Sequence, residues 1–359
     1  MCSMNTMTSM QRTLTTLGHQ EPDRVPLFLL TTMHGARELG LSIQDYFSRA
    51  ENVVEGQMRL LAKFGGDCLY PFAHAALEHE AWGGEVIFSD KGPPNAGAPV
   101  IRRPQDIDHL YSPRVADCPG LQRTLQAQRA LKARVGDTVP IVGVVMSPFS
   151  LPVMQMGFER YLDLMHEQPE RLAQLMRVNE AFAVEWGNAQ LAAGATIICY
   201  FDPVSSSSIV PPPLYRQIGQ PVAQRTLQGL HGPSATAMAS GRCAPILADI
   251  AATGTKALAV SGLEDLAALK AAARGRITLL GNLNGIEMRR WTPQQAEAAV
   301  KRAIAQAGPG GGFILCDNHG EIPWQVGDEV LHAISAAARR WGRYPLDWVR
   351  DDEVALEAT

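Results

Sequence analysis

The 359-residue sequence predicts a (β/α)8 barrel, also called a TIM barrel, an α/β fold. Short aliphatic runs that end in polar residues alternate with longer stretches of helical spacing, which is typical of parallel βα units. Eight such runs occur, and eight parallel strands close this kind of barrel. The expected strands are 24–30, 67–72, 140–146, 195–201, 235–240, 256–260, 277–281 and 312–316.

Amphipathic stretches between these runs predict the helices, and several begin at a Ser, Thr or Asp that can cap a helix. An N-terminal helix over 1–20 is expected to precede the barrel as an extension. The other main helices are expected at 42–64, 169–193, 263–273, 293–307 and 327–341.

Two segments depart from the alternation and are interpreted as insertions. Residues 82–97 (WGGEVIFSDKGPPNAG) predict a β-hairpin arm followed by a Pro/Gly loop, and 203–213 (PVSSSSIVPPP) predict a polar loop after the fourth strand. Neither interrupts the strand pattern, so we expect a single domain over 1–359.

Charge and composition exclude several classes of protein. Lys and Arg number 32 against 36 Asp and Glu, so no basic field is available to bind nucleic acid. The apolar runs are far shorter than the ~20 residues that span a bilayer. The N-terminus lacks a signal-peptide core, and six cysteines show no disulfide spacing. We therefore predict a cytoplasmic enzyme without nucleic-acid or membrane partners.

Active sites of such barrels lie at the carboxyl ends of the strands, and the eighth strand end carries the densest set of reactive groups. The sequence there reads Cys-Asp-Asn-His-Gly-Glu over 316–321. His319 is the predicted acid, base or ligand, and Glu321 would orient it or act as a second base. The alternative is that the carboxylates only cap the next helix.

Other strand ends supply further candidates. Asp202 follows the fourth strand and is predicted to be a catalytic or substrate-binding carboxylate, the alternative being an Asx turn before a proline. Substrate-binding residues are expected after four other strands, although Glu78 could equally belong to a solvated charged loop. They are His34, Glu78, Met146 and Asn284.

Cys243 is a candidate nucleophile or metal ligand. It lies in the expected first turn of a helix beside Arg242, where the helix dipole and the guanidinium would stabilise a thiolate. The alternative is an inert buried cysteine. His-x-Glu-x-His, Cys-x-x-Cys, phosphate-loop and serine-elbow motifs are absent, which disfavours nucleotide-binding folds and ordinary hydrolases.

Five segments together resemble the uroporphyrinogen decarboxylase superfamily, which includes cobalamin-dependent methyltransferases. The resemblance covers about 8–346. The segments occur in the family's order: PDRVP (22–26), the stretch 78–84 before the hairpin, GRCAPILADIAATG (241–254), GNLN (281–284) and NHGEIPWQV (318–326).

The two branches of the superfamily differ in their site residues. Decarboxylases carry an arginine-rich segment after strand one, which LFLLTTMHGARELG (27–40) lacks, and only His319 matches their histidine after strand eight. Zinc-dependent methyltransferases carry His-x-Cys-Gly after strand five and a cysteine after strand eight. Those three positions hold Met238, Ser240 and His319 here. The resemblance therefore allows zinc binding only at a displaced site, formed by Cys243 and His319 with or without Glu321.

The resemblance implies a methyltransferase that moves a methyl group between a small organic substrate and a corrinoid such as methylcobalamin. The corrinoid would be carried by a separate protein, because no Asp-x-His-x-x-Gly motif occurs. His319 and Glu321 would position or protonate the substrate heteroatom, and Asp202 and Asn284 would bind its polar groups. Two alternatives stay open: a carboxy-lyase acting on a cyclic carboxylate, and a non-catalytic partner of a corrinoid protein. A homodimer is one of the oligomeric states that the sequence allows.

Overall fold

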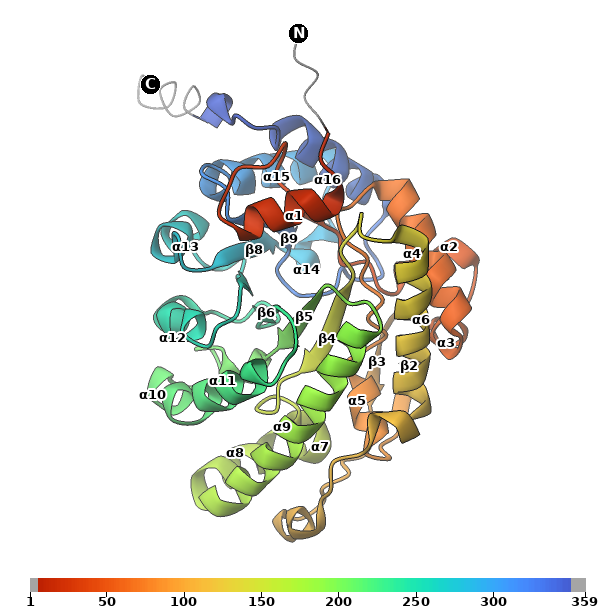
Figure 1. The fold of residues 1–359 in the computed structure, drawn as a ribbon, viewed down its shortest axis with the longest axis vertical. Coiled ribbons are helices and arrows are strands. Elements are labelled where there is room, and N and C mark those ends of the chain that lie inside the picture. Colours follow the sequence, from red (N-terminus) through yellow and green to blue (C-terminus); the bar gives the residue numbers. More distant parts are fainter. Residues whose placement is uncertain (1–5, 350–359) are drawn as a thin grey trace.

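Seven parallel strands form one curled sheet in the computed structural model, which describes residues 6–349 (Figure 1). Their order is β1-β9-β8-β7-β6-β5-β4, so neighbours in the chain are neighbours in the sheet, as a βα barrel requires. The strands are β1 (Leu27–Phe28), β4 (Val142–Met146), β5 (Ile197–Phe201), β6 (Ser234–Ala237), β7 (Ala257–Ala259), β8 (Thr278–Leu283) and β9 (Phe313–Asp317).

The eighth position is occupied by residues 67–70, which close the barrel without forming a regular strand. The amide of Asp67 donates to the carbonyl of Leu27 at 2.7 Å, and Leu69 exchanges hydrogen bonds with Pro140 and Val142 at 2.8 and 2.9 Å. The expected strand over 67–72 is therefore wrong in its extent. Pro71 has no N–H for a ladder, so the pairing stops at a single bridge between Leu69 and Ile141.

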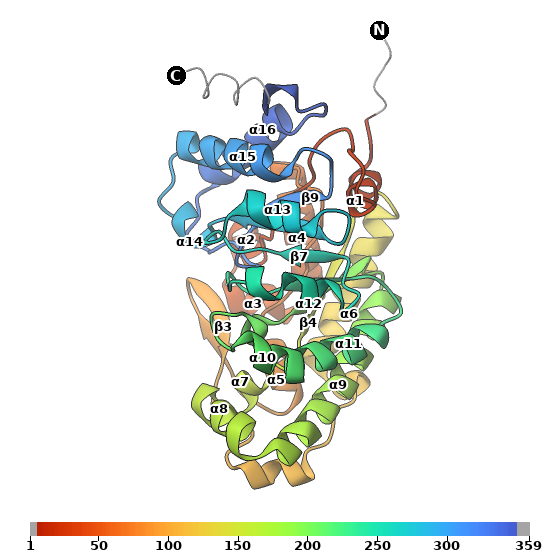
Figure 2. The same ribbon diagram turned by 90° about the vertical axis from the view of Figure 1, so that its left-hand side faces the viewer.

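Helices surround the sheet, and Figure 2 shows α11, α12, α13 and α15 along one side of it. The larger helices are α1 (Ser9–Leu17), α4 (Ala50–Phe64), α6 (Pro119–Val135), α8 (Phe158–Glu167), α9 (Pro169–Ala192), α11 (Gln220–Gln228), α13 (Leu266–Ala273), α15 (Pro293–Ala307) and α16 (Asp328–Trp341). Shorter ones are α2 (His34–Leu39), α3 (Ile43–Ser48), α5 (Ala76–Ala81), α7 (Pro152–Met156), α10 (Pro212–Leu214), α12 (Leu247–Ala251) and α14 (Gly285–Met288).

One expected helix is divided. The amphipathic stretch 42–64 forms α3 and α4, because Arg49 between them adopts an extended conformation with φ −136° and ψ 133°. Ser42 caps α3 by accepting a hydrogen bond from the amide of Asp45.

The predicted hairpin arm is present, as β2 (Val86–Ser89) paired antiparallel with β3 (Gly92–Ala96). The Pro/Gly residues expected to form a loop instead form β3, which has only one partner and therefore tolerates prolines that cannot donate to a ladder. Gln325 donates from Nε2 to the carbonyl of Lys91 at 2.8 Å. The tip of the arm is thus attached to the loop that follows β9.

A buried ion network joins α1, β1 and the closing segment. Asp67 is fully buried and accepts hydrogen bonds from Arg12 at 2.6 Å, from Arg24 at 2.6 and 2.9 Å and from the amide of Leu27 at 2.8 Å. Arg12 also pairs with Asp23 at 2.7 Å. One carboxylate therefore holds the amino-terminal helix to the barrel.

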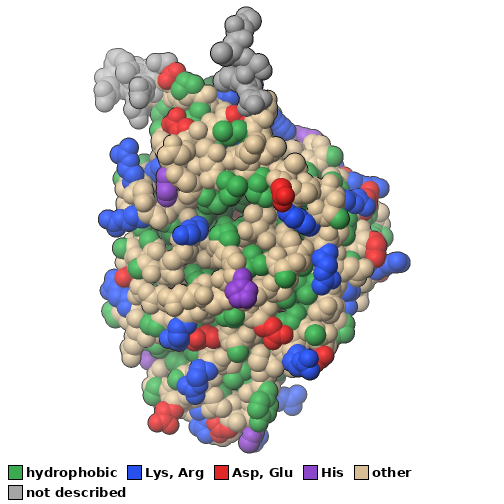
Figure 3. All heavy atoms as spheres, in the orientation of Figure 1, with side chains coloured by type: hydrophobic (Ala, Val, Ile, Leu, Met, Phe, Trp, Pro, Cys, Tyr) green, Lys and Arg blue, Asp and Glu red, His purple; other side chains and the backbone are tan. Residues whose placement is uncertain are grey.

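Acidic and basic side chains are interspersed over the face drawn in Figure 3, with no single-sign patch. This agrees with the near balance of charges in the sequence. Within residues 6–349, no helix is both long enough and apolar enough to cross a membrane.

Candidate active site

The turn after β9 is shaped by its own aspartate. Oδ2 of Asp317 accepts hydrogen bonds from the amides of His319 and Gly320, both at 2.8 Å. Gly320 has φ +90°, a left-handed conformation that glycine adopts without steric cost. The turn leaves His319 and Glu321 only partly buried. The sequence prediction that this strand end presents both side chains together is consistent with that geometry.

His319 contacts Ser240, which follows β6. The Nδ1 atom of His319 lies 2.8 Å from Oγ of Ser240. Ala239 and Ser240 both have left-handed backbones, with φ 45° and 66°, a conformation that costs an L-residue about 1–2 kcal/mol. The amide of Ser240 donates to the carbonyl of Asn318, and Oγ of Ser261 donates to the carbonyl of Ser240, both at 2.8 Å. A strained backbone that several hydrogen bonds hold in place is characteristic of functional sites.

Glu321 has a carboxyl group that changes its protonation state near neutral pH. Burial raises the pKa of its carboxyl to about 7, and the negative charge of Asp317 also raises it. The hydrogen bond from Thr32 lowers this pKa and so offsets part of the rise. At neutral pH the carboxyl is therefore close to half protonated, which suits a general acid or base. Thr32 follows β1, so this contact joins the turns after two neighbouring strands, β1 and β9.

Asp317 contributes a second buried carboxyl. Its Oδ1 atom has no hydrogen-bond partner within the described residues, and burial raises its pKa. The phenyl ring of Phe201, on β5, lies beside this turn. A Cβ placed on Gly320 would be 3.1 Å from Cε2 of that ring. Asp317, His319 and Glu321, with Ser240 and Thr32, are hereafter called the acid cluster.

Asp202 lies after β5, as predicted, but its Oδ1 atom is engaged by the protein. It accepts hydrogen bonds from Oγ of Ser147 at 2.5 Å and from Oγ of Ser150 at 2.7 Å, and the side chain is 1% exposed. Burial raises the pKa of Asp202, whereas the serine hydrogen bonds lower it. These contacts hold the loop after β4 against the turn after β5, so we interpret Asp202 as a positioning residue.

Glu78 and Met146 are both buried and contact each other. The Met146 amide donates to Oε1 of Glu78 at 2.8 Å, and Glu78 lines a small buried space with Gln128, Trp186 and Gln190 between the sheet and the outer helices. The solvated-loop alternative for Glu78 is therefore wrong, and the substrate contacts of these two residues stay predictions. Glu78 lies on α5, which contacts α6 and the two strands of the hairpin arm.

We expect Glu78 to make folding stability pH-dependent. Burial raises its pKa from 4.5 to about 8, so the folded protein retains this proton more tightly than the unfolded chain. The stabilisation is fully present below about pH 4.5 and is lost as the pH rises through about 8. Glu78→Gln should remove the dependence, leaving the variant more stable than wild type by on the order of a few kcal/mol at pH 8.5. Urea unfolding at pH 5 and 8.5 measures this, and parallel pH curves for the two proteins would contradict it.

His34 and Asn284 have structural roles instead of the predicted substrate contacts. His34 begins α2 with no exposed surface, and burial, with Arg37 nearby, lowers its pKa to about 3. Its ring packs 6.4 Å from that of Trp324. Oδ1 of Asn284 accepts from the amides of Ile286 and Glu287 at 3.1 and 3.2 Å, which caps α14.

Cys243 is a buried core cysteine and not an activated thiol. Its amide donates to both carboxylate oxygens of Glu264 at 2.9 and 3.0 Å, and its Sγ lies 3.5 Å from Oε2. Burial, with the negative charge of Glu264, raises the thiol pKa well above its usual value, the opposite of the predicted effect of Arg242. Arg242 itself is exposed.

The donor set does not fit a resident zinc ion. Across the described part of the chain, no group of three or more His, Cys, Asp or Glu side chains is arranged to hold a metal. Cys243 is paired with Glu264 and His319 with Ser240, so the two proposed ligands have separate partners. Met238, at the other ligand position, is buried in the hydrophobic core.

The barrel and the acid cluster at the carboxyl ends of its strands define an enzyme of the TIM-barrel class. The family model described as Uroporphyrinogen decarboxylase (URO-D) matches residues 8–341, and the chain belongs to this family. The superfamily and the barrel predicted from the sequence are thereby confirmed.

Curated relatives and solved structures cover nearly the whole chain. The uroporphyrinogen decarboxylase of Idiomarina loihiensis is 26% identical over 92% of this chain and 95% of its own length. That of Alkalilimnicola ehrlichii is also 26% identical, over 92% and 94%. A methyltransferase from Methanosarcina mazei superposes with a TM-score of 0.80 at 20% identity, over 93% of this chain and 99% of that one. These structural similarities concern the fold.

Proposed function

We propose that this enzyme decarboxylates a small cyclic carboxylate. The observation that carries the proposal is Glu321, a partly buried carboxyl with a pKa of about 7, on the same turn as the His319 held by Ser240. Decarboxylation needs a group that is protonated near neutral pH and can supply a proton to carbon. The curated relatives named as decarboxylases support the same reaction class.

The reaction breaks the bond between the ring carbon and the carboxylate carbon. The electron pair stays on the ring carbon, carbon dioxide leaves, and the Glu321 carboxyl gives its proton to that carbon. Water then reprotonates Glu321, so one proton is consumed and no oxidant is needed. His319 is oriented through Nδ1 by Ser240, which leaves Nε2 to bind the substrate.

The arginine of the segment after β1 is already bound by the protein, which favours a substrate with few carboxylates. Arg37, the arginine of the segment after β1, donates to the carbonyls of Trp324 and Val326 at 3.1 Å and pairs with Asp328 at 2.7 Å. These protein acceptors occupy the guanidinium, so it is not available to bind a substrate carboxylate. We therefore propose a small substrate and not an octacarboxylate porphyrinogen.

Methyl transfer to a corrinoid on a separate protein is the second candidate. It is favoured by the contact between Ser240 and His319, because the family resemblance assigns metal ligands of the methyltransferases to these two positions. A corrinoid partner would supply the methyl acceptor. Glu321 would then protonate the heteroatom that loses the methyl group, and no step involves zinc because the donor set does not fit it.

One assay panel distinguishes the candidates. Cyclic carboxylates with a ¹³C-labelled carboxyl group, uroporphyrinogen among them, are incubated with the enzyme and labelled carbon dioxide is measured. Formation of methylcobalamin from cob(I)alamin is followed in parallel by absorbance, with the same compounds and with methoxylated analogues. We expect carbon dioxide from a small substrate and none from uroporphyrinogen. Formation of methylcobalamin without release of carbon dioxide would replace the first candidate by the second. No turnover in either assay would overturn both and leave a non-catalytic corrinoid-protein partner.

A further inference from the structure

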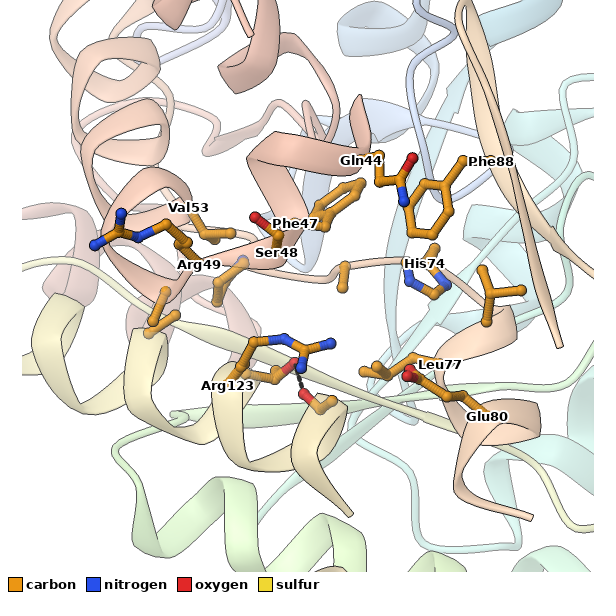
Figure 4. A pocket seen from close by; sticks show the side chains of 17 residues that line it. Gln44, Phe47, Ser48, Arg49, Val53, His74, Leu77, Glu80, Phe88 and Arg123 are labelled. Carbon is orange, nitrogen blue, oxygen red and sulfur yellow. Dashed lines mark hydrogen bonds between the residues drawn. The ribbon is translucent and has the colours of Figure 1, made fainter. Parts of the chain in front are cut away.

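A pocket of about 210 Å³ lies beside the barrel, between α3, α4, α5, α6 and strand β2 (Figure 4). None of the residues of the acid cluster lines it. Gln44, Ser48 and Arg49 form an exposed rim where α3 and α4 meet, so the pocket opens to solvent there.

Aromatic rings form one side of this pocket. His74 is 4% exposed, and its ring centroid lies 5.7 Å from both Phe47 and Phe88 in edge-on geometry. Val53 and Leu77 extend the apolar surface. Edge-to-face packing of this kind would accept a further planar ring.

His74 also offers an unused polar atom. Its Nδ1 is buried and has no hydrogen-bond partner among residues 6–349. Burial, together with the charge of Arg123, lowers the pKa of His74 to about 4, so the imidazole is neutral at pH 7. A neutral imidazole can donate one hydrogen bond to a ligand.

Arg123 extends from α6 across the pocket toward His74, as Figure 4 shows. In the described chain no salt bridge involves Arg123, and its Nε is buried without a hydrogen-bond partner. Glu80, the acidic residue of the lining, lies against the first turn of α6, since a Cβ on Gly120 would be 2.6 Å from its Oε2. The pocket therefore holds a cation without a partner beside an apolar, aromatic wall.

We infer that this pocket binds a small aromatic monocarboxylate, with the ring against Phe47 and Phe88 and the carboxylate on Arg123 and His74. A cavity of about 150 Å³ is large enough for benzene, so 210 Å³ leaves room for a ring and one carboxylate. A guanidinium can bind a carboxylate through two parallel hydrogen bonds. The inference goes beyond the proposed function, because the acid cluster is not part of this site and no bond changes here.

Sodium benzoate is the probe, titrated into the full-length protein by isothermal calorimetry at pH 7.5. Saturable binding is expected, and Arg123→Met should weaken it at least about tenfold by removing the charge-assisted hydrogen bonds. Arg129→Met is the matched control, because Arg129 lies on the same helix α6, is exposed and does not line the pocket. It should change benzoate affinity less than about twofold. Benzyl alcohol, which has the ring without the charge, should bind wild type and Arg123→Met alike.

Two further measurements locate the site independently of variant folding. Benzoate should shift the ¹⁵N resonances of His74 in histidine-labelled wild type and leave those of His319 unchanged. Glu321→Gln should bind benzoate as wild type does, even if it has lost turnover. Absence of saturable binding, shifts confined to His319, or equal affinity in folded Arg123→Met would each overturn the inference. If decarboxylation fails in the assay above while benzoate still binds, only the proposed function is wrong.

Discussion

Exchanging Glu321 for glutamine is expected to lower kcat by about 10²- to 10⁴-fold, the usual contribution of a general acid. Glutamine keeps the size of the side chain and can still accept the hydrogen bond from Thr32. It cannot give up a proton, so the loss should fall on kcat with little change in KM. Steady-state kinetics with the substrate found in the assay panel measure this.

The pH profile gives this prediction a second readout. Because the reactive form of Glu321 is protonated and its pKa is about 7, wild-type kcat should fall as the pH rises above about 7. Residual activity of Glu321→Gln should lack that inflection. Glu287→Gln is the control, since Glu287 is exposed on α14 and should leave both kcat and the profile unchanged. A kcat within twofold of wild type in Glu321→Gln would refute its role as the acid.

Replacing Asp67 by alanine is expected to destabilise the fold by about 3–5 kcal/mol, the cost of leaving buried charges without their partner. Arg12 and Arg24 both bind this carboxylate, and Arg12 is 4% exposed, so its guanidinium cannot readily regain water. The variant also loses the acceptor for the amide of Leu27. Urea unfolding at pH 7 measures the change in the free energy of unfolding.

Asp137→Ala supplies the matched comparison for that experiment. Asp137 also forms an ion pair, with Lys132, but its side chain is 91% exposed. Solvent screening limits such a pair to less than about 1 kcal/mol. If Asp67→Ala unfolds with the same midpoint as Asp137→Ala, the network does not hold α1 and the closing segment to the barrel.

Local sequence patterns were sufficient to predict the barrel and one part of its site, the turn after β9. Seven of the predicted runs form parallel strands, because buried strands must be aliphatic and the helices between them must be amphipathic. The turn from Asp317 to Glu321 was also predictable. Its hydrogen bonds join residues only two and three positions apart, so a few adjacent residues determine it.

Contacts between distant residues were not predictable in this way. Ser240 and His319 are 79 positions apart, and Thr32 and Glu321 are 289 apart. Sequence comparison singled out Ser240 as a replaced ligand but not as the partner of His319. The left-handed φ at Ala239 and Ser240, where no glycine marks such a conformation, gave no signal in the sequence.

The sequence by itself determined which residues form strands and helices and which strand end carries the acid cluster, because periodicity and short-range hydrogen bonds are local properties. Only the tertiary structure decided which polar side chains reach a substrate. Glu78 and Cys243 are buried beside partners from other elements, and Asn284 caps a helix. Burial and the nearest charge decide the protonation of a side chain, and both depend on elements that meet only when the barrel closes.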